Sequence, residues 1–428
     1  MKKLAIHGGP KTIDYTFKPY NSIGEEERIA VNEVMQTGIL SRYLGVWSPD
    51  FYGGPKIQEF EQAAQGYFGT KHAIVVNSCT SGLIAAVGAI GIQPGNEVIV
   101  SPWTMSATAT SILMWNAIPV FADIESEFFC IDSASVEKNI TPHTKAIIAV
   151  DIYGHSADMD SILRIAKKHD LKVISDCAQA PAAKYKGKLA GTLADIGVYS
   201  LNYHKHIHTG EGGIIVTNND IYAEKLQLIR NHAEVVVENK GVSDLSNMLG
   251  YNFRLGEIEA AIGVEQLKKL NKIADRTTAL GSRLSEGLQG LDGLQPPKVN
   301  KNCTHVYYAY PLVFNAGRLN IQRQLIYNAL VAEGVPLGQG YTNIHLLPMY
   351  QQKIAYGKKG FPWNSEIYKG SVDYRKGICP VAERLHDKEI ITIPFCMHTW
   401  EKEDIDMIIK AFQKVWAHLD MLQSTGNE

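Results

Sequence analysis

The sequence predicts an α/β protein with a mostly parallel β-sheet covered by helices on both faces. Between about residues 70 and 220, short apolar segments rich in Val and Ile alternate with longer amphipathic ones. Several of the short segments are bounded by Gly, Pro or Asp, which end strands. Strands that alternate with helices pair in parallel, because each helix carries the chain back to the same edge of the sheet. We therefore expect functional residues at the carboxyl ends of the strands, where such sheets bind ligands.

Seven segments are expected to form this sheet. In chain order they read HAIVVNS, EVIVSP, PVFADI, AIIAVDIYG, KVISDCAQ, IGVYSLN and GGIIVTNN. TSGLIAAVGAI and ADMDSILRIAKKHD are expected to be helices between them, and in the second Met159, Ile162 and Leu163 contribute to an apolar stripe of helical period. This part of the chain is predicted to be the large domain.

After about residue 255 the pattern changes to a long helix, LGEIEAAIGVEQLKKLNKIADRTTALGSRLSEGL, followed by a mixture of helices and strands. We expect a large domain over residues 1–265, with its N-terminal segment packed on a small α+β domain over 266–428. Residues 233–249 and 351–377 are polar, and we expect them to be irregular. Loops of that length are more often functional than idle.

Bulk properties exclude several classes of protein. The 428 residues carry a net charge of −2, so nothing favours general attraction to nucleic acid or membrane. The apolar run near the N-terminus is too short for a signal peptide, and no apolar stretch is long enough to span a bilayer. The six cysteines show no CxxC pairing, so we expect free thiols and a cytoplasmic protein.

Three motifs place polar residues at expected strand ends. Asp176 follows an apolar strand and precedes Gln179; as a single residue it fits a helix cap equally well. The stretch NSCTSGL ends a strand and opens a helix, a place where backbone N–H groups suit a phosphate, although an ordinary cap explains it too. Lys205 follows Ser200 and precedes the Gly-rich TGEGG, in surroundings that lower the pKa of an amine and make it a nucleophile.

Three histidines, His204, His206 and His208, alternate around Lys205. On a strand they would share one face, with Lys205 on the other, and that face could hold a metal. No further cluster of Cys or His supplies a fourth ligand. We therefore expect no metal site, and we interpret the histidines as a structural frame or as groups that contact substrate and tune the lysine.

Together, these motifs resemble the DegT/DnrJ/EryC1/StrS family of sugar aminotransferases, which are fold-type I pyridoxal 5′-phosphate enzymes. The resemblance covers nearly the whole chain. It rests on GNEVIVSPWTMSATATSILMWNAIPVFADI, SDCAQAPAAKYKGKLAGTLADIGVYSLN, TGEGGIIVTNN, GYNFRLGEIEAAIG and CPVAERLHDKEIITIPF, which follow one another in the family's order.

The resemblance implies a role for each site residue. Lys205 matches the lysine that binds the cofactor covalently, and Asp176 the carboxylate that faces the pyridine nitrogen. Gln179 matches a side chain near the phenolic oxygen. The residues that match phosphate contacts are Cys79, Thr80, Ser81, Ser200 and Asn252. The family usually has glycine at the position of Cys79. Asn252 matches an asparagine that reaches the phosphate bound by the neighbouring subunit of a homodimer.

The family also stacks an aromatic ring on the cofactor, at the position that Met105 occupies here. Either Met105 covers the cofactor ring as an apolar surface, or Trp103 takes the aromatic role. The carboxylate of the amino donor needs a cation, for which Arg254 and Arg230 are candidates, although each is more often structural in such a position.

The implied reaction moves an amino group from glutamate, which becomes 2-oxoglutarate, to a keto or aldehyde sugar. The chain length, SPWTMSATAT and the Lys-rich residues 351–377 resemble the branch that aminates an 8-oxo-3-deoxy-octulosonate for lipopolysaccharide. Its product is the 8-amino-3,8-dideoxy sugar. Nucleotide-linked 3- or 4-keto-6-deoxy sugars are the alternative acceptors. A sugar dehydratase and a non-enzymatic sensor on the same fold are rival functions. The presence of Lys205 argues against the dehydratase, and the complete set of Asp176, Gln179, Ser200 and Lys205 argues against the sensor.

Overall fold

The computed structural model describes residues 3–423 and contains a seven-stranded sheet in the order β1-β9-β8-β5-β4-β2-β3. The seven strands are β1 (His72–Val76), β2 (Glu97–Val100), β3 (Ile118–Phe121), β4 (Thr144–Val150), β5 (Lys172–Asp176), β8 (Ile196–Ser200) and β9 (Gly213–Thr217). Neighbours from β3 to β8 pair in parallel, and only β9 runs antiparallel, to β8 and to β1. The expected α/β architecture and all seven expected strands are confirmed.

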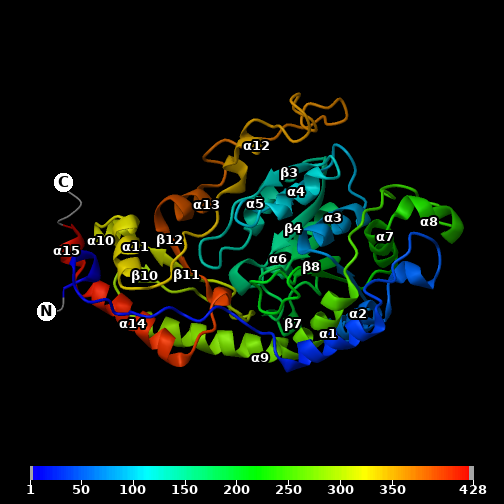
Figure 1. Cartoon of the computed structure of the whole chain (residues 1–428). Coiled ribbons are helices and arrows are strands. Elements are labelled where there is room, and N and C mark those ends of the chain that lie inside the picture. The colour runs from blue at the N-terminus through cyan, green and yellow to red at the C-terminus, as the bar shows by residue number, and fades with distance from the viewer. Residues whose placement is uncertain (1–2, 424–428) are drawn as a thin grey trace.

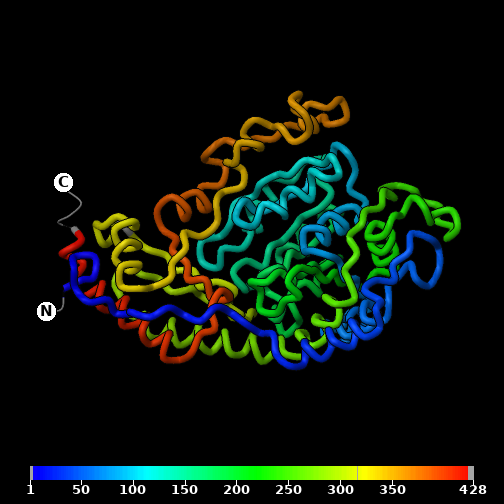
Figure 2. Tube along the Cα trace, in the orientation of Figure 1, coloured from blue at the N-terminus to red at the C-terminus, as the bar shows by residue number. Residues whose placement is uncertain are grey.

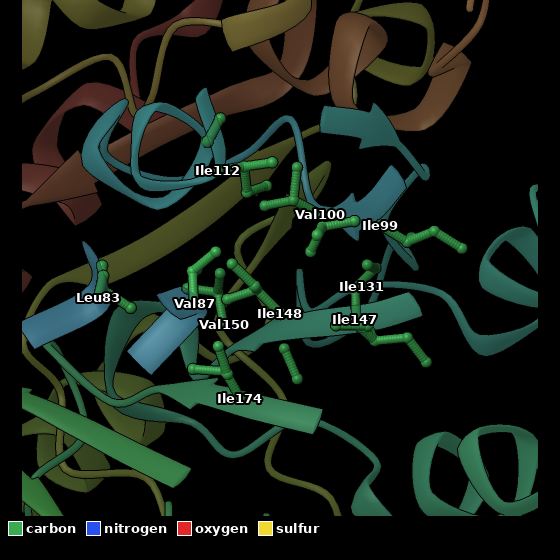
Figure 3. Close-up of a cluster of buried hydrophobic side chains, with 14 of the residues drawn as sticks. Leu83, Val87, Ile99, Val100, Ile112, Ile131, Ile147, Ile148, Val150 and Ile174 are labelled. Atoms are coloured by element: carbon green, nitrogen blue, oxygen red, sulfur yellow. The ribbon is translucent and has the colours of Figure 1, made fainter. Parts of the chain in front are cut away.

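Alternating residues of β1 show how the two faces are covered. Ile74 and Val76 belong to the core cluster that includes α3 (Cys79–Ala89), while Ala73 and Val75 belong to the cluster formed with α2 (Pro55–Phe68) and α9 (Glu257–Leu288). Successive side chains of a strand point to opposite faces, so both faces are dry and the strands are apolar throughout. Figure 3 shows the first of these cores, where side chains of β2, β4 and β5 meet Leu83 and Val87 of α3.

The remaining elements follow the same plan. The other helices of the large part are α1 (Glu25–Thr37), α4 (Ala107–Leu113), α5 (Ser133–Lys138), α6 (Met159–His169), α7 (Asp220–Arg230) and α8 (Ala233–Lys240), and β6 (Lys184–Tyr185) pairs with β7 (Lys188–Leu189). The C-terminal part contains β10 (Leu294–Gln295), β11 (Tyr310–Phe314), β12 (Ile390–Ile393), α10 (Ala316–Leu319), α11 (Arg323–Ala332), α12 (Pro348–Gln351), α13 (Pro380–Arg384), α14 (Lys402–Trp416) and α15 (Leu419–Gln423). Its three strands form an antiparallel sheet, so this part is α+β.

The long helix α9 runs under both parts of the molecule (Figure 1). It is continuous across residue 265, so the proposed boundary between 1–265 and 266–428 falls inside a helix, and the division remains a proposal. The N-terminal segment runs back along α9 and α14 (Figure 2). Its residues Leu4, Ile13 and Phe17 are buried in the core of the C-terminal part.

Two segments expected to be irregular differ from each other. Residues 233–240 form α8, because Ala233 and Val236 pack on Phe51 and Leu228 in a small apolar cluster. This part of the prediction was wrong.

Residues 351–377 contain little regular structure beyond the end of α12 and lie beside the edge strand β3, as Figure 1 shows. The Tyr374 hydroxyl donates a hydrogen bond to the Pro119 carbonyl of β3 (2.6 Å). The segment therefore covers a sheet edge that would otherwise be open to pairing.

Candidate active site

A cavity of ≈ 430 Å³ lies where the carboxyl ends of β5 and β8 meet the N-terminus of α3 and the C-terminal part of the chain. It is lined by Ser78, Cys79, Thr80, Leu83, Thr104, Met105, Ala107, Asp176, Ala178, Gln179, Ser200, Asn202, His204, Lys205, Glu211, Tyr308 and Tyr341. Seven of the ten residues expected from the sequence are among them. Ser81, Trp103 and Asn252 are not.

Lys205 lies in the loop that follows β8, with 8% of its surface exposed. Its Nζ is 4.1 Å from the centroid of the Tyr308 ring, and no hydrogen bond or ion pair joins this amine to any residue between 3 and 423. Burial lowers the pKa of the amine, and the negative charge of Asp176 partly opposes that shift. A buried amine without a fixed partner, and with a lowered pKa, is suited to act as a nucleophile and proton carrier.

Asp176 is the last residue of β5 and is 4% exposed. Its Oδ2 accepts a hydrogen bond from the Thr108 hydroxyl (2.8 Å), and its Oδ1 accepts one from the Ala178 backbone N–H (3.1 Å). Burial raises the pKa of this carboxyl, and the two hydrogen bonds and Lys205 oppose that shift. Thr108 therefore holds a buried carboxylate in one orientation toward the cavity.

Gln179 connects the two parts of the molecule at the cavity. Its Oε1 accepts a hydrogen bond from the Tyr153 backbone N–H (2.9 Å), and its Nε2 donates to the Tyr341 hydroxyl (3.0 Å). Because Gln179 is 3% exposed and both ends of its amide are used, its position is closely defined.

The start of α3 forms an anion cradle. Ser78 is the N-cap and its Oγ accepts from the Ser81 N–H (3.0 Å), while the Ser81 hydroxyl donates to Asn77 Oδ1 (2.6 Å) and so is turned away from the cavity. Position 213, in the Gly-rich run after Lys205, requires glycine, because a Cβ there would lie 2.8 Å from the Ser78 backbone. Free N–H groups at a helix N-terminus, with hydroxyls such as those of Thr80 and Ser200, bind phosphate.

The three histidines do not lie on a strand, since residues 201–212 form turns and bends. His206 is fully buried and pairs through Nε2 with the Val306 carbonyl (2.8 Å), and only His204 reaches the cavity. Burial lowers the pKa of both His204 and His206 to about 4, so both are neutral at pH 7. Between residues 3 and 423, no three His, Cys, Asp or Glu side chains are grouped to hold a metal.

Other candidates from the sequence lie away from the cavity. Trp103 is 0% exposed and donates through Nε1 to the Tyr153 hydroxyl (3.0 Å), whereas Met105 lines the cavity and is 61% exposed. Arg230 is also 0% exposed and pairs with Glu61 (2.5 Å). Arg254 donates through Nε to Asn252 Oδ1 (2.8 Å) and does not line the cavity.

Several residues of the site were not found from the sequence. Ser78 and Thr108 resemble ordinary helix residues, although a Ser just before a helix is a known capping signal. Tyr308 and Tyr341 come from the C-terminal part, and no local pattern marks them as neighbours of Lys205. Their positions follow only from how that part packs on the large sheet.

These residues fit pyridoxal phosphate. The Asn202 Oδ1 and His204 Nδ1 atoms in the cavity wall are buried without a hydrogen-bond partner in the described chain, as expected where a ligand completes the site. A phosphate matches the start of α3, a cationic ring nitrogen matches Asp176, and an aldehyde matches the free amine of Lys205. When bound, this cofactor supplies an electron sink that stabilises negative charge on a substrate carbon. The fold and site thus define a pyridoxal phosphate enzyme.

Comparison with known proteins specifies the family. The profile of the DegT/DnrJ/EryC1/StrS aminotransferase family matches residues 21–373. The chain is 34% identical to the spore coat polysaccharide biosynthesis protein SpsC of Bacillus subtilis (strain 168) over 82% of this chain and 90% of that protein. It is 37% identical to the GDP-perosamine synthase of Caulobacter vibrioides over 69% of this chain and 79% of that one.

A solved structure agrees. Helicobacter pylori PseC, an aminotransferase involved in the biosynthesis of pseudoaminic acid, superposes with a TM-score of 0.76 at 27% identity, covering 94% of this chain and 100% of that one. The chain therefore belongs to the DegT/DnrJ/EryC1/StrS aminotransferase family, and it is a pyridoxal phosphate-dependent sugar aminotransferase. Between residues 3 and 423, none of the helices is both long and apolar enough to cross a bilayer.

We expect Thr108→Val to lower the transamination rate roughly ten- to hundredfold, because a hydrogen bond to a charged group contributes about 1.5–3 kcal/mol. Thr108→Ser keeps the hydroxyl and should restore most of the rate. Thr110→Val is the matched control on the same helix, since the Thr110 hydroxyl bonds only to the Ser106 and Ala107 carbonyls. Steady-state rates and the absorbance of the bound cofactor would be measured. Equal losses in the two valine variants would contradict this role.

Proposed function

We propose that the protein transfers the amino group of glutamate to a keto sugar, with Lys205 as the catalytic residue. The observation that carries this proposal is one cavity that holds the unpaired Lys205 amine, the buried Asp176 carboxylate and the N-terminus of α3. Lys205 Nζ would bind the cofactor covalently and would carry the proton to and from the α-carbon of the donor. Asp176 would keep the ring nitrogen protonated.

The other residues bind and orient the cofactor. Ser78, Cys79, Thr80 and Ser200 line the cavity and would hold the phosphate, and Gln179 would contact the phenolic oxygen. Met105, rather than the buried Trp103, would cover one face of the cofactor ring, because Met105 lines the cavity and Trp103 does not. Of the two rival functions, a sensor requires no transferable amine, and the presence of Lys205 argues against a dehydratase.

For the acceptor, we favour a nucleotide-linked keto sugar over 8-oxo-3-deoxy-octulosonate. The structural reason for the octulosonate was a basic loop that could pair with its carboxylate. No residue of 351–377 lines the cavity, and Lys205 is the one Lys or Arg among the lining residues of the described chain. Related proteins carry names such as GDP-perosamine synthase and UDP-N-acetyl-3-dehydro-alpha-D-glucosamine 3-aminotransferase, which support nucleotide-linked acceptors.

A screen with the purified holoenzyme tests the proposal. The enzyme would receive ¹⁵N-labelled glutamate or glutamine together with GDP-linked 4-keto, UDP-linked 3-keto or octulosonate acceptors, and mass spectrometry would detect labelled amino sugar. We expect labelled product from at least one nucleotide-linked sugar. Labelled product from the octulosonate alone would overturn the choice of acceptor. Absence of any donor-dependent change of the cofactor absorbance would overturn the aminotransferase proposal itself.

We further propose a homodimer whose sites are shared through Asn252. Asn252 is exposed, and its backbone carbonyl accepts from Asn77 Nδ2 (3.4 Å) next to the start of α3. The segment between residues 29 and 47 exposes large apolar side chains that a monomer rarely leaves open, namely Ile29, Met35, Ile39, Leu40, Leu44, Val46 and Trp47. A partner subunit would cover them.

Complementation would test the shared site. We expect Asn252→Asp to weaken cofactor binding at least about tenfold, because its carboxylate would repel the phosphate at short range. Mixed dimers of Asn252→Asp with Lys205→Ala should regain activity, since one of their two sites then combines a wild-type lysine with a wild-type asparagine. Light scattering would confirm the dimer. Fully active monomers, or mixed dimers as inactive as their parents, would rule the arrangement out.

A further inference from the structure

A second cavity, of ≈ 380 Å³, lies between α9, the residues 20–26 that lead into α1, and residues 395–400 before α14. We call it the α9 cavity. It shares no lining residue with the cavity that contains Lys205. Ligand pockets usually measure about 300–1,000 Å³, so the α9 cavity has room for a small ligand of its own.

The rim of the α9 cavity carries positive charge. Lys269, Lys272 and Arg276 follow one another at spacings of three and four residues, so they share one face of α9. Glu26 is the one acidic residue in the described lining, and it is already paired with Lys269 (3.2 Å). Arg276 pairs with Glu401 (2.8 Å), whereas Lys272 is exposed and has no hydrogen bond or ion pair within residues 3–423. One cation is therefore free to pair with one negative charge of a ligand.

The interior of the α9 cavity is aromatic and aliphatic. Phe395 and Trp400 line it and are 1% and 3% exposed, and Ile273 and Leu280 add aliphatic side chains from the same face of α9. Burying an apolar ring is favourable, whereas burying an unpaired charge is costly. A cationic rim over an apolar interior therefore suits an organic anion that buries its ring and keeps its charged group at the rim.

His398 gives an independent indication of a ligand. It lines the α9 cavity, and its Nδ1 atom is buried without a hydrogen-bond partner in the described chain. Burial lowers the pKa of this imidazole, so it is neutral at pH 7 and either ring nitrogen can carry the proton. Buried polar atoms are nearly always paired, so an acceptor oxygen of a ligand would complete the hydrogen bonding of His398.

The α9 cavity adjoins the contacts that hold the loop of Lys205. Tyr20 lines the cavity and donates a hydrogen bond from its hydroxyl to the backbone carbonyl of His206, the residue after Lys205. Thr277 also lines it and donates to the Val306 carbonyl (2.9 Å), which His206 Nε2 contacts as well (2.8 Å). A ligand in the α9 cavity would therefore touch two of the side chains that fix His206.

From these observations we infer that the α9 cavity is a regulatory site for a small organic anion with an apolar ring and one carboxylate, which acts on Lys205 through Tyr20 and His206. The ring would be buried against Phe395 and Trp400, and the carboxylate would pair with Lys272. An occupied cavity would shift the Tyr20 hydroxyl and, with it, the loop that carries Lys205. The inference goes beyond the proposed transamination, because the ligand is neither donor nor acceptor.

Two matched probes test the binding site with the holoenzyme. Indole-3-acetate carries one carboxylate, indole-3-acetamide has the same shape without the charge, and titration calorimetry would measure the binding of each. We expect the acetate to bind at least about tenfold more tightly than the amide, the usual effect of one hydrogen bond to a charged group. Lys272→Met should weaken binding of the acetate about three- to tenfold. Lys268→Met is the matched control and should leave binding unchanged, because Lys268 is exposed on α9, pairs with Glu265 and does not line the cavity.

A blocking variant makes the test independent of charge. Ile273 lines the α9 cavity and is half-buried, so Ile273→Trp should fill the cavity and abolish binding of indole-3-acetate. Ala279→Trp, at an exposed position of α9 outside the lining, is the matched control and should bind as wild type does. Thermal unfolding would confirm that each variant is folded.

The absorbance of the cofactor on Lys205 tests the regulatory effect. Binding of indole-3-acetate should change this absorbance in the wild-type holoenzyme. Tyr20→Phe keeps the ring and removes the hydroxyl, so it should bind the probe within about threefold of wild type but lose the absorbance change. No binding, equal binding of both probes, binding that survives Ile273→Trp, or binding without any absorbance change would overturn the inference. None of these readouts needs turnover, so failure of the proposed transamination remains distinguishable.

Discussion

Lys205→Ala is expected to abolish transamination while the protein remains folded and still binds pyridoxal phosphate. The loss of the proton carrier alone removes about 10²–10⁴ in rate, and the loss of covalent attachment removes more. Folding should survive because the Lys205 amine makes no hydrogen bond in the described chain and occupies a cavity. Rates with glutamate, thermal unfolding and titration of the apoenzyme with cofactor would measure the three effects.

Borohydride reduction identifies the lysine directly. Reduction of the wild-type holoenzyme should fix the cofactor on Lys205, which peptide mass spectrometry would locate, and Lys205→Ala should carry no label. Lys184→Ala, an exposed lysine on β6, is the matched control and should behave as wild type. Label on another lysine, or normal turnover of Lys205→Ala, would refute the assignment.

The histidines around Lys205 should respond differently from it. His204→Ala removes one side chain of the cavity wall and should change the rate only modestly, and a chelator should have no effect. His206→Ala should instead lower stability, because His206 is fully buried and pairs with the Val306 carbonyl. Inactivation by EDTA that zinc reverses would contradict this interpretation.

Asp176→Asn should lower the transamination rate about 10²–10³-fold, an effect typical of removing one preorganised electrostatic group from an active site. The substitution keeps the shape of the side chain and removes the charge that holds a proton on the ring nitrogen. The absorbance of the bound cofactor and its pH dependence should change with it. Activity within about twofold of wild type would exclude the proposed role of Asp176.

In contrast to the transamination rate, the thermal stability of the apoenzyme should not be lowered by Asp176→Asn. Burial raises the pKa of Asp176 in the folded state, so the folded protein holds its proton more tightly than the unfolded chain. Stability from this group is therefore lost as the pH rises from the unfolded pKa through the folded pKa, and the ionised form is unfavourable at neutral pH. Removing the charge should leave the unfolding temperature of the apoenzyme equal or higher, which calorimetry would show. A clear decrease would indicate a structural carboxylate.

The location of the main chemistry could be predicted because it depends on local pattern. Apolar runs such as KVISD and IGVYS form strands wherever they are buried on both faces, so Asp176 and Ser200 had to lie at strand ends. Parallel pairing brings these ends to one edge of the sheet, and the loop after Ser200 carries Lys205 there. The resemblance to a family then supplied their roles.

Side-chain direction and contacts between distant segments could not be predicted in this way. Ser81 and Trp103 stand in the expected motifs, but their hydrogen bonds to Asn77 and Tyr153 turn them away from the cavity. Such bonds depend on the rotation of a helix and on a neighbouring loop, which the local sequence does not specify. The same holds for Thr108, whose contact with Asp176 joins α4 to β5.

The sequence by itself determined the sheet, the strand-end positions of Asp176 and Ser200, and the placement of Lys205 in the following loop, because apolar periodicity and strand ends are properties of neighbouring residues. The tertiary structure decided which side chains complete the cavity. Tyr308 and Tyr341 reach Lys205 and Gln179 only because the C-terminal part packs over the carboxyl edge of the sheet.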